Sequence, residues 1–113
     1  MSNSLIFEAC VETLEDALAA ERRGANRIEL CSALDQDGLT PSEELTRQCV
    51  QNLSIPVMAM VRPRGGNFVY TEEEISAMEA EIEFFKQSGV AGVVFGLLTE
   101  SGDIDVENTS RLA

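Results

Sequence analysis

Short apolar segments alternate with segments of helical periodicity along this chain of 113 residues, and this alternation restricts its fold most. Runs of β-prone residues predict strands near residues 5–11, 27–31, 56–62 and 92–97. Helices are predicted near residues 14–23, 41–51 and 72–88, with a last helix beginning after Asp105. Strands separated by single helices pair in parallel through right-handed crossovers. We therefore expect one α/β domain over residues 1–113, a length that supports one hydrophobic core.

Capping residues mark the predicted helix starts. Thr13 is placed to cap the first helix, and Thr71 with Glu74 forms a capping-box pattern before the third. For the second helix, Thr40 is the predicted N-cap and Pro41 the first helical residue.

Charged residues within the strands distinguish two architectures for such units. Glu8 and Cys10 share one side of the first strand, and Glu29 and Cys31 share one side of the second. In a doubly wound sheet that side lies under helices, where a carboxylate is costly. In a parallel strand-helix (TIM-type) barrel it faces the lumen. A full barrel needs about 250 residues, so the pattern predicts four strands, about half of a barrel.

The charge balance excludes several classes of partner. Twenty Asp and Glu against eight Lys and Arg give a net charge of −12, which disfavours nucleic acids and anionic membrane surfaces. No apolar run approaches the roughly 20 residues of a membrane helix, and residues 1–4 lack the basic start of a signal peptide. A cytoplasmic location is expected. The chain has no histidine, which removes His-ligated metals and Ser-His or Cys-His nucleophile pairs.

The loop after the third strand has the composition of an anion site. Its candidate anion-binding residues are Arg62, Arg64, Gly65 and Gly66. Arginines bind carboxylate or phosphate well, and glycines let a ligand approach the backbone closely. The alternative is structural: the two arginines neutralise the strand glutamates Glu8 and Glu29.

Sulfur-containing side chains form the second candidate site. Cys10 and Cys31 would lie close together if the first two strands are adjacent, and two thiolates suit Cu(I). The alternative is that each cysteine is a small buried apolar residue. Cys49 is interpreted as helix packing. Met58 and Met60 alternate on the third strand, either as core residues or as thioether ligands.

The strand glutamates are the third candidate. Without histidine, Glu8 and Glu29 are the best candidates for general acid and base. The alternative is an ion pair with Arg62 in the lumen.

Taken together, these segments resemble the CutC family, whose proteins carry a copper homeostasis label. The matching stretches are residues 8–11, 24–31, 38–42, 55–57, 61–66 and 92–96. The resemblance implies a strand-helix barrel, a cytoplasmic location, self-association and a Cu(I) role for Cys10 and Cys31. Two departures are visible: the family continues for another four strand-helix units, and its third strand often carries histidine at the position of Met58.

Three functional hypotheses follow. The first is CutC-like copper handling, with Cu(I) held by thiols. The second is a barrel enzyme acting on a small anionic or phosphorylated substrate held by Arg62 and Arg64. The third is an inactive truncated fragment. Because half a barrel leaves the first and fourth strands with free edges, we also expect a homo-oligomer, most simply a dimer.

Overall fold

A computed structural model describes residues 5–113, in which four strands alternate with four α-helices and a short 3₁₀ helix. The elements are β1 (Glu8–Val11), α1 (Leu14–Arg22), β2 (Arg27–Leu30), η1 (Leu34–Gln36), α2 (Glu43–Asn52), β3 (Val57–Met60), α3 (Glu72–Ser88), β4 (Gly92–Val94) and α4 (Val106–Leu112).

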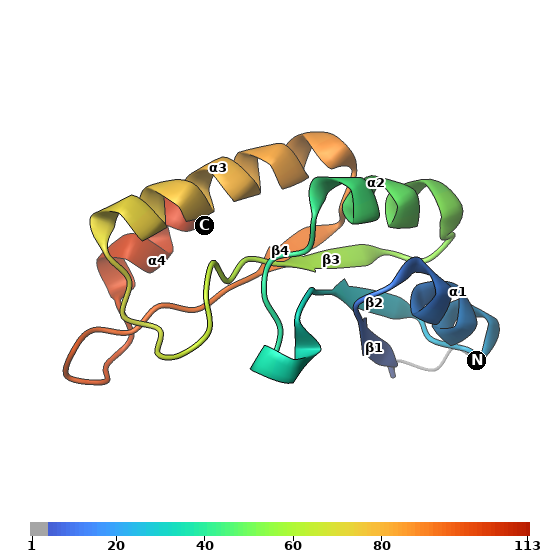
Figure 1. The fold of residues 1–113 in the computed structure, drawn as a ribbon, viewed down its shortest axis with the longest axis horizontal. Helices are drawn as coiled ribbons and strands as arrows, with labels where there is room; N and C mark the ends of the chain where they lie inside the picture. Colours follow the sequence, from blue (N-terminus) through green and yellow to red (C-terminus); the bar gives the residue numbers. More distant parts are fainter. Residues whose placement is uncertain (1–4) are drawn as a thin grey trace.

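All four strands belong to one parallel sheet in the order β1-β2-β3-β4. Glu8 pairs with Arg27 at the start of β2, and Met58 pairs with Gly92 at the start of β4. Figure 1 shows α2 and α3 above the sheet and the segment that contains η1 below it. Successive parallel strands in sequence order, each followed by a helix, are the arrangement of half a TIM-type barrel, which confirms the predicted fold class.

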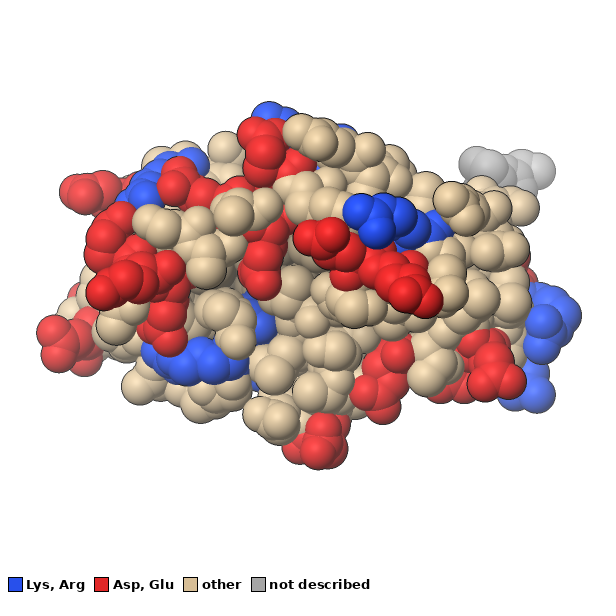
Figure 2. Space-filling model, turned by 45° about the horizontal axis from the view of Figure 1, so that its top comes forward, with Lys and Arg blue, Asp and Glu red and all other residues tan. Residues whose placement is uncertain are grey.

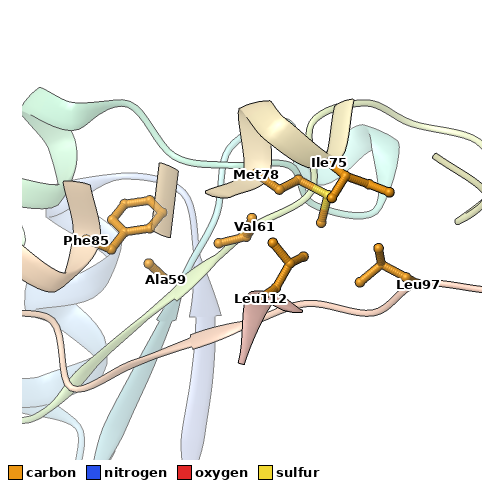
Figure 3. Close-up of a cluster of buried hydrophobic side chains, with 7 residues drawn as sticks. All are labelled: Ala59, Val61, Ile75, Met78, Phe85, Leu97 and Leu112. Atoms are coloured by element: carbon orange, nitrogen blue, oxygen red, sulfur yellow. The ribbon is translucent and has the colours of Figure 1, made fainter. Parts of the chain in front are cut away.

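The hydrophobic core lies between the sheet and the helices, in two clusters. The larger buried set joins β3 and the segment after β4 to α3 and α4 (Figure 3): Ala59, Val61, Ile75, Met78, Phe85, Leu97 and Leu112. The other joins β1, β2 and β3 to α1 and α2: Val11, Ala17, Ile28, Leu30, Cys49 and Val57. Alternate strand residues therefore bury their side chains under helices, and the remaining ones face the open side of the sheet.

The caps of α1 and α3 are those predicted. The Thr13 hydroxyl accepts a hydrogen bond from the Asp16 amide, and Thr71 forms the full capping box with Glu74. The predicted cap of α2 was wrong, because Ser42 caps that helix and accepts from the Leu45 amide.

Thr40 instead connects the segment before α2 to the end of β3. Its hydroxyl accepts from the Arg62 amide at 2.9 Å and donates to Glu81 at 3.1 Å. A hydroxyl committed to these two partners is not available to cap a helix.

The strands are shorter than predicted. Ladder pairing starts at Glu8 rather than residue 5, and it ends at Val94 rather than residue 97. Val93 and Phe95 pack against the helix-side cluster, so the β4 side chain on the open face is that of Val94. Within residues 5–113, no helix combines the length and apolar character needed to cross a bilayer.

Candidate functional site

The open face of the sheet brings together the two strand cysteines and one glutamate. Ala9 and Val11 of β1 pack toward the helices, and so do Ile28 and Leu30 of β2. The intervening residues Cys10, Glu29 and Cys31 consequently share the opposite face, as their spacing predicted.

These three side chains form a compact donor group. The Sγ atoms of Cys10 and Cys31 are 3.4 Å apart. The Glu29 Oε1 lies 4.0 Å from the Cys10 sulfur and 3.9 Å from the Cys31 sulfur. Cys10 is exposed, whereas Cys31 is fully buried. One thiol therefore faces solvent and the other is sealed beneath it.

The environment of the group raises the pKa of two of its members, Cys31 and Glu29, and so disfavours their negatively charged forms. Burial is the main cause that raises the pKa of the Cys31 thiol far above its ordinary value, with neighbouring Cys10 and Glu29 adding to it. Burial, followed by the nearby carboxyl of Glu8, raises the pKa of Glu29. A bound cation reverses this preference, because it favours the negatively charged form of each ligand.

The strand glutamates do not pair with the loop arginines. Glu8 forms an ion pair with Arg27, its neighbour across the sheet, at 2.6 Å between Oε2 and Nε. The alternative interpretation, in which Arg62 and Arg64 neutralise Glu8 and Glu29, was therefore wrong, because the partners of the two arginines are loop carbonyls and Glu74. Arg27 could not be identified as the partner of Glu8 from the sequence, because the pairing depends on the register of β1 against β2.

Arg62 connects two loops at the carboxyl ends of the strands, the one around η1 and the one after β3, by hydrogen bonds. One of its Nη atoms donates to the carbonyls of Gln36 and Gly38 at 2.8 and 3.2 Å, and the other donates to the Gly66 carbonyl at 3.0 Å. Its guanidinium also stacks on Phe68, 4.9 Å from the ring centre. The buried Nε has no hydrogen-bond partner among the described residues.

Arg64 is more completely engaged. All five of its N–H groups donate within residues 64–74: two to the Glu74 carboxylate and the others to the carbonyls of Gly65, Asn67 and Val69. The hydrogen bond from Arg64 is the main cause that lowers the pKa of Glu74. An anion would have to displace one of these bonds to reach Arg64.

A cleft of about 470 Å³ opens beside Arg62. Its lining includes Met60, Arg62, Gly66 and Phe68. Of the predicted anion-binding residues, the structure thus places Arg62 and Gly66 at one cleft, while Arg64 and Gly65 belong to the internal bonding of the loop.

Sequence reasoning missed Gly38 as a site residue. A Cβ atom at Gly38 would lie 3.4 Å from the Cys31 sulfur and 3.8 Å from the Cε of Met60. Its φ of 96° is a conformation that glycine adopts without strain. Cys49, by contrast, is fully buried in the helix-side cluster, as its interpretation as packing predicted.

The model of the CutC family matches residues 5–113. The chain belongs to the CutC family. Among curated relatives, a human copper homeostasis protein cutC homolog is 49% identical over 106 residues, which cover 94% of this chain and 39% of the relative. A CutC family protein of Salmonella paratyphi A is 42% identical over 95% of this chain and 43% of its own length. The chain thus spans about two fifths of the length of these CutC relatives.

Solved structures support the same fold. A copper homeostasis protein CutC from Streptococcus agalactiae aligns with a TM-score of 0.88 at 35% identity, covering 96% of this chain and 53% of that protein. A thiamine phosphate pyrophosphorylase from Pyrococcus furiosus aligns with a TM-score of 0.54 at 28% identity, over 79% of this chain and 37% of its own length. The CutC structure matches almost all of this chain and extends to nearly twice its length.

Proposed function

We propose that this CutC-family chain binds Cu(I) through the thiolates of Cys10 and Cys31, as part of a cytoplasmic protein that handles copper. The observation that carries the proposal is the 3.4 Å separation of the two Sγ atoms on the open face. Thiolates are soft ligands that favour Cu(I). The exposed Cys10 is the first sulfur that an arriving ion would meet, and the buried Cys31 would hold the ion away from water.

The donor set favours Cu(I) over a structural zinc ion. A closed zinc site takes four ligands, usually Cys and His. Within residues 5–113, the one grouping of Cys, His, Asp and Glu donors is Cys10, Glu29 and Cys31. Two sulfurs and a single carboxylate fall short of a zinc cage, whereas two thiolates can satisfy Cu(I).

The charge of the chain supports encounter with a cation. Figure 2 shows acidic side chains spread over much of the visible face, interrupted by smaller basic groups. A net charge of −12 raises the local concentration of cations around the chain. When the two thiols lose their protons on binding, their two negative charges exceed the single positive charge of Cu(I).

The test is an anaerobic competition titration of Cu(I) against a colorimetric chelator. The chain should take Cu(I) from the chelator with a one-to-one end point, and Cys10→Ser with Cys31→Ser should abolish this. Cys49→Ser is the matched control, because Cys49 is also fully buried but lies in the helix-side cluster. Equal binding by the wild type and the double variant would rule out the thiol site, and absence of binding by both would favour an inactive fragment.

A second candidate function is the binding of a small anionic substrate at the cleft beside Arg62. The observation that favours it is the Arg62 Nε, which is buried without a hydrogen-bond partner among the described residues. Glu8 and Glu29 would then be the acid and base on the same open face. Titration calorimetry with inorganic phosphate tests the idea: wild-type binding lost in Arg62→Met supports it, and no heat with the wild type contradicts it.

Self-association is the remaining part of the proposal. Within residues 5–113 the outer edges of β1 and β4 have no partner strand, and unpaired edges favour further strand pairing. A dimer that joins the β4 of each copy to the β1 of the other would close eight strands.

A further inference from the structure

The open face carries two thioethers that the two-cysteine site does not use, those of Met58 and Met60, and Met60 is the one level with Cys31 in the sheet. Met60 ends β3, where Leu30 pairs with Ala59, so the next residues along the two strands are Cys31 and Met60. Val57 and Ala59 are buried under helices, which places Met60 on the open face with Cys31.

Gly38 shows how close the two side chains come. The position of a Cβ atom on Gly38 lies 3.4 Å from the Cys31 Sγ and 3.8 Å from the Met60 Cε, the methyl carbon bonded to the thioether sulfur. Both sulfur-bearing side chains therefore border the space where a side chain at position 38 would begin. Met60 also lines the cleft of about 470 Å³, so part of its side chain is open to solvent.

The separation of the two thiols leaves room for another ligand. At a metal–sulfur distance of about 2.3 Å, as in zinc thiolates, sulfurs 3.4 Å apart would subtend roughly 95° at the ion. The two thiolates thus occupy one side of the ion. A further donor is needed to cover the other side unless the strands move apart.

We propose that Met60 is the third ligand of Cu(I) in this chain, and that its thioether makes the site prefer Cu(I) to harder ions. The inference rests on the proposed binding of Cu(I) by Cys10 and Cys31. Thioethers bind Cu(I) well and bind Zn²⁺ poorly, because they are soft and uncharged.

Glu29 is the competing third donor. Its Oε1 lies 4.0 Å and 3.9 Å from the two thiol sulfurs. A carboxylate is a hard ligand that suits Mg²⁺, Ca²⁺ or Mn²⁺ better than Cu(I). Glu29 is therefore expected to matter for a harder ion at this position, and Met60 for Cu(I).

The matched variants are Met60→Leu and Met58→Leu, since exchange of methionine for leucine conserves volume and removes only the sulfur. Met58 lies on the same face of β3, but its side chain extends over Gly92 of β4. A Cβ atom added to Gly92 would lie only 2.7 Å from the Met58 Cε. Met60→Leu should lower Cu(I) affinity in the competition titration at least about tenfold, a scale known for loss of supporting groups at metal sites. Its Zn²⁺ affinity should be unchanged, and Met58→Leu should match the wild type for both ions.

X-ray absorption of the Cu(I)-loaded wild type gives an independent readout that requires no variant to fold. Three sulfur ligands are expected in the wild type and two in Met60→Leu. Two sulfurs in the wild type, or an oxygen ligand lost in Glu29→Gln, would overturn the inference. If Met60→Leu binds Cu(I) like the wild type while the double cysteine variant does not, the third-ligand inference fails and the proposed function stands. A wild type that binds no Cu(I) ends both.

Discussion

Replacement of Gly38 by alanine should weaken both the fold and the copper site. Gly38 has a φ of 96°, and a residue with a Cβ costs roughly 1–2 kcal/mol in a left-handed conformation. The free energy of unfolding should fall by that amount, and each kcal/mol lowers the melting temperature by roughly 4–8 °C in a small domain. The new methyl would also lie 3.4 Å from the Cys31 sulfur, in space that an ion bound there needs.

Gly24→Ala separates these two effects. Gly24 has a φ of 104°, and a Cβ there would meet no atom of the described residues within 4 Å, its two chain neighbours aside. In urea unfolding followed by circular dichroism, Gly24→Ala should lower the free energy of unfolding by about as much as Gly38→Ala does. Only Gly38→Ala should also lower Cu(I) affinity in the chelator competition, by about tenfold or more on the scale of metal-site perturbations. Equal Cu(I) affinities in the two variants would refute the position of Gly38 against the thiol site.

Three further predictions concern the fold and its assembly. Phe85→Ala should lower the free energy of unfolding by about 3–5 kcal/mol, because the Phe85 side chain is only 1% exposed; a loss below about 1 kcal/mol in urea unfolding would contradict its burial. Arg64 lowers the pKa of Glu74 below 4.5, so the stabilisation is present above that pH and is lost as the pH falls through the lower, folded-state pKa. The urea midpoint of the wild type should therefore fall more steeply on acidification than that of Glu74→Gln, and parallel curves would argue against the ion pair. The melting temperature should rise with protein concentration and with salt, which screens repulsion between chains of charge −12; a sedimenting monomer whose melting ignores concentration would contradict the closure of two copies.

The fold could be predicted from sequence because its signals are local. Two local signals define α3 without reference to the rest of the chain. One is the capping box of Thr71 and Glu74, and the other is the 3.6-residue periodicity of Ile75, Met78, Ile82 and Phe85. The cap of α2 could not be chosen this way, because Thr40 and Ser42 are both good caps and a distant contact to Arg62 decides between them.

The site was predictable only in part, for reasons of register and backbone geometry. The shared face of Cys10, Glu29 and Cys31 follows from the two-residue repeat of a strand. The partners of Arg62 do not, because they are backbone carbonyls in the loop around η1. That loop contains Ala33 and Asp37 at positive φ, a conformation that Asp adopts more often than most residues but that the residue type of Ala33 did not predict.

The most direct test of the central claim is the position of the metal itself. Crystals of the chain prepared with Cu(I) under anaerobic conditions should give one strong anomalous peak at the copper absorption edge. The account predicts this peak within bonding distance of the Sγ atoms of both Cys10 and Cys31, on the open face of β1 and β2. A peak confined to Cys49 or to the acidic helix surface, with the two strand thiols free of metal, would contradict it.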